Sequence, residues 1–190
     1  MSRFDKILVL DLDETLIHAS RRPLARDPDF CVFDYFIYKR PHVDVFLRTC
    51  LSWFQVGVWS SSGTRYAAAV AENLFEHPSE LAFCWAQDRC ITRFHWQTGE
   101  NSYLKPIKKL QRKGYAKEKI LYVDDSPEKL IRSYGNAIYV RTFDGIDEGD
   151  NELELLLRYL KFLGPVDDVR RLEKRNWRGS REVTGRDPLP

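Results

Sequence analysis

The segment that most constrains the fold is an apolar run that leads directly into two acidic residues. Residues 7–10 are Ile-Leu-Val-Leu, and Asp11 and Asp13 follow on either side of Leu12. Such a run is typical of a strand buried on both faces, as in a parallel sheet covered by helices. Because charges do not belong inside such a strand, we place Asp11 and Asp13 at its carboxyl end. In open α/β sheets that edge is where ligands bind.

Two carboxylates at that edge allow a specific chemistry. They can hold a hard cation such as Mg²⁺, which takes oxygen ligands and keeps several waters. Beside a cation, one carboxylate can attack a phosphorus centre while the other manages the proton. An Asp-x-Asp pair is also compatible with a turn cap and a solvated side chain, so this interpretation depends on partners elsewhere in the chain.

The rest of the chain alternates between expected strands and helices. Further strands are predicted over residues 54–59, 83–85, 120–123 and 137–140, and helices over 41–53, 64–75, 103–114, 151–163 and from Pro127 after a Ser126 cap. Residues 30–38 suit a hairpin or flap, and residues 86–101 suit a polar loop that carries aromatic side chains. Strands that alternate with helices in this way predict an α/β fold with a doubly wound, Rossmann-like parallel sheet.

Length and composition exclude several classes of protein. The 190 residues suit one domain with a sizeable core, and the formal net charge of +2 is close to neutral. No apolar run approaches the roughly 18 residues of a membrane helix, and the amino terminus has no signal-peptide core. We therefore expect a cytoplasmic protein, or a nuclear one in a eukaryote, without a membrane partner. The cysteines lack C-x-x-C spacing, which favours reduced thiols, and Cys50 and Cys84 lie in apolar segments where we expect burial.

Chemically complementary groups stand at other expected element ends. Ser60 follows the second strand, Asp124 and Asp125 follow a later one, and Lys105 lies at the start of a basic helix. Each is ordinary for its place, because a serine after a strand is usually a cap and a lone lysine is usually solvated. Together with the first two acids, they indicate one site at the carboxyl edge of the sheet.

In this order and context, these residues resemble the four motifs of the haloacid-dehalogenase (HAD) superfamily of phosphohydrolases. Within it, the chain is similar to the small phosphatases that act on the carboxy-terminal repeat tail of RNA polymerase II, and to their bacterial relatives. The resemblance covers residues 6–169. It is carried by Leu10 to His18 (LDLDETLIH), Lys39 to Leu47 (KRPHVDVFL), Trp59 to Ala67 (WSSSGTRYA), Tyr103 to Lys105, Val123 to Pro127 (VDDSP) and Leu155 to Val169.

The resemblance implies a role for each residue. Asp11 would attack phosphorus and form an aspartyl-phosphate. Asp13 would protonate the leaving oxygen and then activate water for the second step. Ser60 and Lys105 would bind the non-bridging phosphoryl oxygens in a loose transition state. Thr15 would support the loop after the first motif as a hydrogen-bonding residue.

The same resemblance implies a magnesium ion as cofactor. The ion would be held by the Asp11 carboxylate, the backbone carbonyl of Asp13 and the Asp124 carboxylate. The eukaryotic tail phosphatases commonly have asparagine where this chain has Asp125. This second acid would therefore either reach the metal, directly or through water, or orient Lys105.

The motif positions also suggest how the chain is divided. We expect residues 1–169 to form the phosphatase domain, with a flap over residues 20–40 and a variable segment over residues 76–102. We expect residues 170–190 to form a basic, poorly packed tail, although Trp177 is typical of an anchoring residue. This arrangement leaves no room for a large cap domain.

An open site favours a phosphate carried by a macromolecule. The resemblance implies phosphoserine or phosphothreonine of a protein. A first alternative is a nucleic-acid 3′ end or a nucleotide. A second alternative is a non-catalytic binding module of the same fold, which the presence of both Asp11 and Asp13 opposes.

The nucleic-acid alternative depends on a basic and aromatic segment. Its basic residues are Arg89, Arg93, His95, Lys105, Lys108, Lys109, Arg112, Lys113, Lys117 and Lys119. Trp85, Phe94 and Trp96 could offer stacking faces to bases. The other interpretation is that the lysines form one solvated helix face and that the aromatic residues lie in the core.

Overall fold

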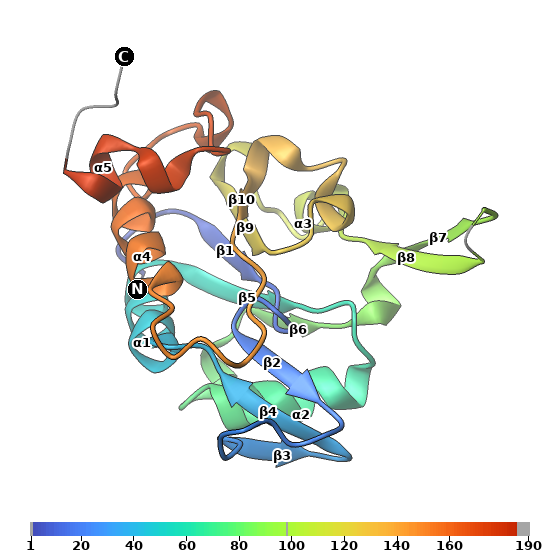
Figure 1. The fold of residues 1–190 in the computed structure, drawn as a ribbon. Coiled ribbons are helices and arrows are strands. Elements are labelled where there is room, and N and C mark those ends of the chain that lie inside the picture. The colour runs from blue at the N-terminus through green and yellow to red at the C-terminus, as the bar shows by residue number, and fades with distance from the viewer. Residues whose placement is uncertain (1, 98, 186–190) are drawn as a thin grey trace.

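The computed structural model describes residues 2–97 and 99–185, and its centre is a five-stranded parallel sheet (Figure 1). The strand order is β10, β9, β1, β5, β6. The strands are β1 (Ile7–Leu10), β5 (Gln55–Trp59), β6 (Phe83–Trp85), β9 (Ile120–Asp124) and β10 (Ala137–Tyr139). Leu10 of β1 lies opposite Val58 of β5 and Val123 of β9, so the carboxyl ends of the three central strands meet at one edge.

Helices cover both faces of this sheet. The α-helices are α1 (Val43–Trp53), α2 (Thr64–Leu74), α3 (Lys108–Gln111), α4 (Glu152–Leu163) and α5 (Arg181–Thr184). Leu8 and Leu10 of β1 belong to an apolar cluster with residues of α1, α2 and α4, whereas Ile7 and Val9 belong to a second cluster that includes a residue of α3. The alternation of β1 side chains between two clusters confirms the predicted doubly wound α/β fold.

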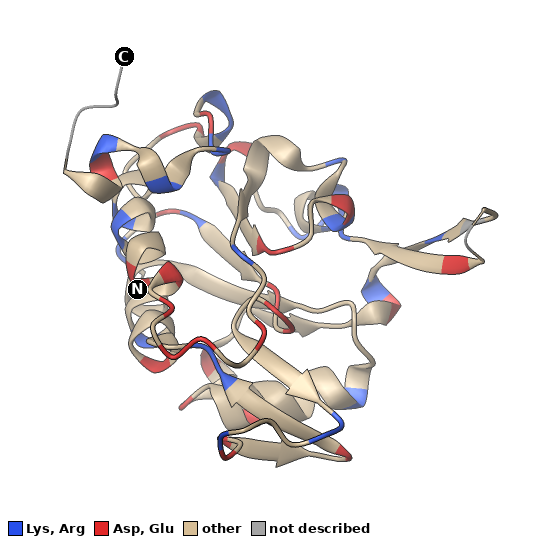
Figure 2. Ribbon diagram, viewed as in Figure 1, with Lys and Arg blue, Asp and Glu red and all other residues tan. Residues whose placement is uncertain are grey.

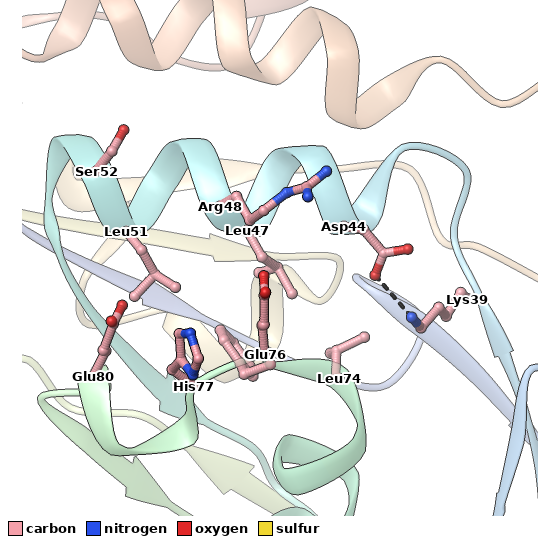
Figure 3. A pocket seen from close by; sticks show the side chains of 11 residues that line it. Lys39, Asp44, Leu47, Arg48, Leu51, Ser52, Leu74, Glu76, His77 and Glu80 are labelled. Carbon is pink, nitrogen blue, oxygen red and sulfur yellow. Dashed lines mark hydrogen bonds and ion pairs between the residues drawn. The ribbon is translucent and has the colours of Figure 1, made fainter.

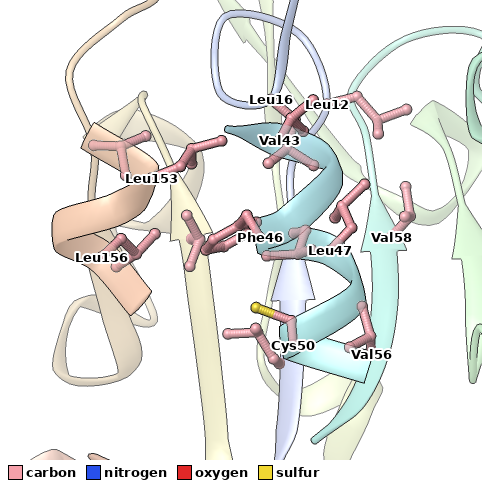
Figure 4. Packing of buried hydrophobic residues seen from close by; sticks show 14 of the residues in the cluster. Leu12, Leu16, Val43, Phe46, Leu47, Cys50, Val56, Val58, Leu153 and Leu156 are labelled. Atoms are coloured by element: carbon pink, nitrogen blue, oxygen red, sulfur yellow. The ribbon is translucent and has the colours of Figure 1, made fainter. Parts of the chain in front are cut away.

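The larger cluster forms where α1 meets β5 and α4 (Figure 4). Phe46, Leu47 and Cys50 follow helical spacing on α1 and are buried, and Val56 and Val58 come from alternate positions of β5. Burying a Phe or Leu side chain stabilises a fold by about 1.5–3 kcal/mol. This packing therefore fixes β5, and with it the position of the residues that follow the strand.

Short 3₁₀ helices connect these elements. They are η1 (Pro78–Glu80), η2 (Gln87–Arg89), η3 (Lys117–Lys119), η4 (Pro127–Leu130), η5 (Tyr134–Asn136), η6 (Val169–Arg171) and η7 (Trp177–Gly179). A helix capped by Ser126 was predicted where η4 lies. That prediction is wrong in detail, because the Ser126 hydroxyl donates to Asp125 Oδ1 at 3.0 Å and a single 3₁₀ segment follows.

Two small antiparallel sheets extend from the body in different directions (Figure 1). The first contains β2 (Ile17–Ser20), β3 (Phe30–Val32) and β4 (Tyr35–Lys39), in the order β2, β4, β3, where a flap was predicted. The second is a hairpin of β7 (Ile91–His95) and β8 (Glu100–Leu104). The loop predicted over residues 86–101 is therefore wrong. The turn of the hairpin includes Gly99 at φ 71°, a conformation that favours glycine.

The basic helix predicted over residues 103–114 is also largely wrong. Strand β8 continues to Leu104, and α3 contains four residues. The Lys105 amide donates to the Lys129 carbonyl at 2.8 Å, and Pro106 has no amide hydrogen to donate, so regular helix begins later. The lysines of this stretch consequently lie on a turn, a short helix and η3, and not on one helix face.

The described part of the carboxy-terminal segment, residues 170–185, is packed and is not the poorly packed tail that we expected. The Trp177 side chain is 1% exposed, and its ring stacks on Tyr159 of α4 with centroids 5.7 Å apart. Its Nε1 donates to the Tyr139 carbonyl at 2.9 Å. Residues 186–190, the end of the predicted tail, lie outside the described residues.

The four cysteines are free thiols. Cys50 is buried, as predicted, whereas Cys84 is exposed on the edge strand β6, so the predicted burial of Cys84 is wrong.

Across residues 2–97 and 99–185, no helix has both the length and the apolar character that crossing a membrane requires.

Candidate active site

The carboxyl edge of the sheet brings together residues from three strands. Asp11 follows β1, Ser60 follows β5, and Asp124 is the last residue of β9. All three are buried. The strand order places Asp11 between the other two, and its amide donates to the Val123 carbonyl at 3.0 Å. Acidic segments accordingly lie at the loops that follow the central strands (Figure 2).

Lys105 joins two of these carboxylates. Its Nζ lies 2.9 Å from Asp11 Oδ1 and 2.6 Å from Asp124 Oδ2, and its side chain is 1% exposed. A buried ammonium is costly unless it is paired, and here it is paired twice. The structure thus brings Lys105 together with both acids, as the motif positions predicted.

A second lysine, which the sequence analysis missed, lies on the other side of the same carboxylates. Lys129 of η4 has its Nζ 2.7 Å from Asp11 Oδ2, 3.5 Å from Asp124 Oδ1 and 3.6 Å from Asp125 Oδ1. Its sequence signal was the i, i+4 spacing from Asp125, which brings an acid and a lysine together at a helical turn.

These charges shift the pKa values of one another. Burial would raise the pKa of Asp11, but the charges and hydrogen bonds of Lys105 and Lys129 outweigh it and lower that pKa. Burial, followed by repulsion from Asp11, raises the pKa of Asp124 to about 7. Burial would lower the pKa of Lys129, but the carboxylates of Asp11 and Asp124 raise it. Asp11 is therefore the carboxylate that is held in its anionic form.

Asp13 lies apart from this cluster and contacts hydroxyl groups. The Ser62 hydroxyl donates to Oδ2 at 2.7 Å, the Tyr66 hydroxyl donates to Oδ1 at 2.6 Å, and the Ser60 hydroxyl lies 3.4 Å from Oδ2. Burial raises the pKa of Asp13, and the hydrogen bonds from Tyr66 and Ser62 only partly oppose this rise. A carboxyl group with a raised pKa is suited to proton transfer. Sequence analysis missed Ser62 and Tyr66, although both belong to the stretch that carried the second motif.

Thr15 connects the loop of the first motif to the end of β9. Its hydroxyl oxygen accepts from the Asp125 amide at 3.1 Å, and its carbonyl accepts from the Arg40 guanidinium at 3.0 Å. The Asp125 carboxylate lies beside Lys129, at 3.6 Å. Thr15 therefore fixes the spacing between the two acidic loops.

Three carboxylates of the site form a group that could hold a metal ion. One oxygen from each of Asp11, Asp124 and Asp125 lies within 4.8 Å of the others. Carboxylate oxygens are the ligands that Mg²⁺ takes in proteins, so this donor set fits that ion. Within the described residues, the Asp13 carboxylate is not a member of this group, and its expected metal contact was through the backbone carbonyl.

A separate cavity lies between α1 and the end of α2 (Figure 3). It has a volume of about 600 Å³ and is lined by Lys39, Asp44, Leu47, Arg48, Leu51, Ser52, Leu74, Phe75, Glu76, His77 and Glu80. Lys39 and Asp44 form an ion pair of 2.8 Å at its edge. None of the strand-end residues lines this cavity, so it is not part of the candidate active site.

The sequence model of a family described as NLI interacting factor-like phosphatase matches residues 6–170, which include every residue of the site. The chain belongs to this family. The family contains HAD-superfamily phosphatases, so the resemblance that the motifs indicated is confirmed, and the chain is a phosphatase of the HAD type.

Individual relatives agree with the family. The chain is 34% identical to CTD nuclear envelope phosphatase 1B of Danio rerio over 186 residues, which cover 90% of this chain and 72% of that protein. It is 33% identical to carboxy-terminal domain RNA polymerase II polypeptide A small phosphatase 1 of Homo sapiens over 174 residues. These residues cover 87% of this chain and 62% of that protein.

Solved structures show the same fold at low sequence identity. Fcp1, an essential RNA polymerase II CTD phosphatase, matches with a TM-score of 0.56 and 17% identity, over 84% of this chain and 51% of that chain. An uncharacterized protein from Listeria monocytogenes serotype 4b matches with a TM-score of 0.57 and 14% identity, over 85% of this chain and 99% of that chain. These matches support the α/β fold with its parallel sheet.

Proposed function

We propose that this phosphatase hydrolyses a phosphomonoester through an aspartyl-phosphate on Asp11, with Mg²⁺ as cofactor and phosphoserine or phosphothreonine of a protein as substrate. The observation that carries the proposal is the contrast between buried Asp11 and partly buried Asp13. The pKa of Asp11 is lowered beside Lys105 and Lys129, whereas burial raises that of Asp13.

Asp11 and Asp13 have different roles in the proposed reaction. An Asp11 oxygen forms a bond to phosphorus while the ester P–O bond breaks, and Asp13 gives its proton to the leaving oxygen. Asp13 then takes a proton from water as the water oxygen attacks phosphorus. The bond between phosphorus and Asp11 breaks, which releases inorganic phosphate and restores both carboxyl groups.

Ser60 and Lys105 are proposed to bind the non-bridging oxygens of the phosphoryl group. The Ser60 hydroxyl lies near Asp13 Oδ2, and the Lys105 ammonium lies against Asp11 Oδ1, so one donor lies beside each of the two acids. Fixed donors at this position would stabilise the charge that spreads over these oxygens in the transition state.

The magnesium ion is proposed to be held by the carboxylates of Asp11 and Asp124 and the backbone carbonyl of Asp13, with Asp125 as a further ligand. When bound, it supplies positive charge that allows a carboxylate to approach a phosphate dianion. The close carboxylate oxygens of Asp11, Asp124 and Asp125 support this assignment.

A protein substrate is supported by the relatives, because the human relative is named for the carboxy-terminal domain of RNA polymerase II.

We also retain residues 1–169 as the phosphatase domain, with its flap and its variable segment, and residues 170–190 as a carboxy-terminal segment. A nuclear or cytoplasmic location agrees with the relative named for the nuclear envelope.

One observation favours a nucleic-acid 3′ end or a nucleotide as a second candidate substrate. Phe94 and Trp96 of the β7–β8 hairpin are 44% and 89% exposed, so the interpretation that they lie in the core is wrong. Their rings meet edge to face at 4.8 Å, and Figure 2 shows Lys and Arg residues on α3 and near the base of this hairpin. A polynucleotide should then compete with an aryl phosphate in a manner that high salt suppresses. If it does not compete, this candidate is excluded.

The first experiment measures phosphate release from an aryl phosphate, a phosphoserine peptide and a 3′-phosphorylated oligonucleotide, with and without Mg²⁺. Asp11→Asn should lose all metal-dependent turnover because the amide is not a nucleophile. Asp167→Asn is the matched control, since the Asp167 side chain is fully exposed. Turnover that survives Asp11→Asn would refute the mechanism, and no turnover by the native chain would favour the non-catalytic binding module.

A further inference from the structure

Lys129 lies where a divalent cation would lie among the carboxylates. Its ammonium is 2.7 Å from Asp11, 3.5 Å from Asp124 and 3.6 Å from Asp125. These are the same three residues whose oxygens form the candidate metal group. Among the described residues, it is the cation that lies within 4.0 Å of all three carboxylates. The space for a metal ion is therefore already filled by a positive charge.

Lys105 contacts the opposite oxygens and is held differently. It binds Asp11 Oδ1 and Asp124 Oδ2, whereas Lys129 faces Asp11 Oδ2 and Asp124 Oδ1. The side chain of Lys105 is 1% exposed, and that of Lys129 is 17% exposed. Lys105 is therefore enclosed, while Lys129 has a path towards solvent.

The backbone of Lys129 is fixed by hydrogen bonds, whereas its side chain reaches solvent. Its carbonyl accepts from the Lys105 amide at 2.8 Å, and its own amide donates to the Ser126 carbonyl at 3.2 Å. Leu130, the next residue, is buried in the second apolar cluster. Movement of the ammonium away from the carboxylates thus requires rotation of the side chain and no rearrangement of η4.

We propose that Lys129 is a resident counter-ion that competes with the divalent cation, and that metal binding displaces its ammonium from the three carboxylates. The proposal rests on the metal site of the proposed function. An ammonium in contact with these oxygens blocks a Mg²⁺ ion at its ligand distance of about 2.0–2.1 Å, and the two positive charges repel each other. The lysine keeps the acids together without metal, and it weakens their affinity for the ion.

The first test is calorimetric titration of Mg²⁺ into the purified chain without substrate. Lys129→Met should bind Mg²⁺ at least tenfold more tightly, which is about 1.4 kcal/mol, because no ammonium has to be displaced. Lys129→Arg keeps the charge and should bind as weakly as the native chain. Lys119→Met is the matched control, since Lys119 pairs with Asp167 outside the site, at 3.4 Å.

A second measurement uses the native chain and does not depend on a variant that folds. Acetylation of each lysine by acetic anhydride is followed by mass spectrometry, with and without Mg²⁺. Addition of the ion should increase labelling of Lys129, because its ammonium has moved into solvent, and should leave labelling of Lys161, which is exposed on α4, unchanged. Labelling of Lys129 that stays constant or falls would contradict displacement.

The outcomes separate this inference from the function on which it rests. Equal Mg²⁺ affinity in the native chain and Lys129→Met would refute the inference and leave the metal site intact. Absence of Mg²⁺ binding in both would refute the metal site and the inference together. Tighter binding in Lys129→Met, with weak binding in Lys129→Arg, is the result that the structure predicts.

Discussion

At the scale of single residues, the orientation of Asp13 depends on the hydroxyl groups around it. Tyr66 and Ser62 each donate to a different oxygen of this carboxylate, at 2.6 and 2.7 Å. The two bonds restrict rotation of the carboxyl group and leave it near Ser60. A general acid has to face the leaving oxygen, so the orientation that these hydroxyls impose is part of its function.

Tyr66→Phe should lower kcat by about 10- to 100-fold with a smaller effect on KM, because a hydrogen bond to a charged group contributes about 1.5–3 kcal/mol. Steady-state kinetics on an aryl phosphate measure this change. Tyr134→Phe is the matched control, since Tyr134 is 75% exposed. Unchanged kcat in Tyr66→Phe would mean that Ser62 orients Asp13 without it.

The same contacts explain which site residues the sequence could reveal. Asp11 and Asp13 directly follow a strand that can be identified from its apolar composition, so their position at the edge of the sheet was predictable. Tyr66 acts on an acid 53 positions away, and Lys129 acts on one 118 positions away. Spacings of this length carry no sequence signal, because the proximity arises only when the strands align. The short-range signal for Lys129 is its i, i+4 spacing from Asp125.

At the scale of elements, the carboxy-terminal segment is a structural part of the molecule. Trp177 packs against Tyr159 of α4 and donates to the last residue of β10. It therefore joins a helix on one face of the sheet to an outer strand. The composition of this segment is typical of a loose tail, since the apolar anchor is one residue among many charged ones.

Trp177→Ala should destabilise the protein by about 3–5 kcal/mol, the usual loss when a buried aromatic side chain is removed. Trp96→Ala is the matched control at an exposed position and should change stability by less than about 0.5 kcal/mol. Urea unfolding of both variants, monitored by circular dichroism, compares them. Equal stability of the two variants would show that the segment is dispensable.

Strands inside the core and strands outside it differ in predictability. The runs at β1, β5 and β9 are apolar because both faces are covered, so composition identifies them. The β7–β8 hairpin projects from the body with exposed residues on both strands, which gives no continuous apolar face. Its pairing follows from the turn and from local register, and these leave a weak sequence pattern.

At the scale of the whole molecule, stability against acid depends on buried ion pairs outside the site. Glu152 at the start of α4 is buried and accepts from Arg141, in the segment after β10, and from Arg178, in the carboxy-terminal segment. Burial would raise the pKa of Glu152, but the hydrogen bonds and charges of Arg178 and Arg141 outweigh it and lower that pKa. The folded state thus favours the ionised form.

Because this pKa is lower in the folded state than the usual 4.5, the contribution of Glu152 is complete above that value and is lost as pH falls through the folded pKa. Glu152→Gln should be less stable than the native chain at pH 7 and should lose less stability between neutral and acidic pH. Thermal unfolding at a series of pH values measures how the stability of the native chain and of Glu152→Gln changes with pH. Glu118→Gln, at an exposed position, is the control and should show the same dependence of stability on pH as the native chain. If the stability of Glu152→Gln fell with pH as steeply as that of the native chain, this account would be contradicted.

The small size of the flap and the hairpin has a consequence for how the reaction is shielded. Enzymes with a mobile lid expel water before the chemical step, and the lid does so whatever the size of the substrate. On an open sheet edge, the molecule that carries the phosphate has to do this itself. A bulky protein against the rim would exclude water from the partly exposed groups there, Asp13 and Lys129, whereas a small ester would leave water beside them. In such an enzyme, selectivity for large substrates arises from hydration and does not require recognition of any particular sequence.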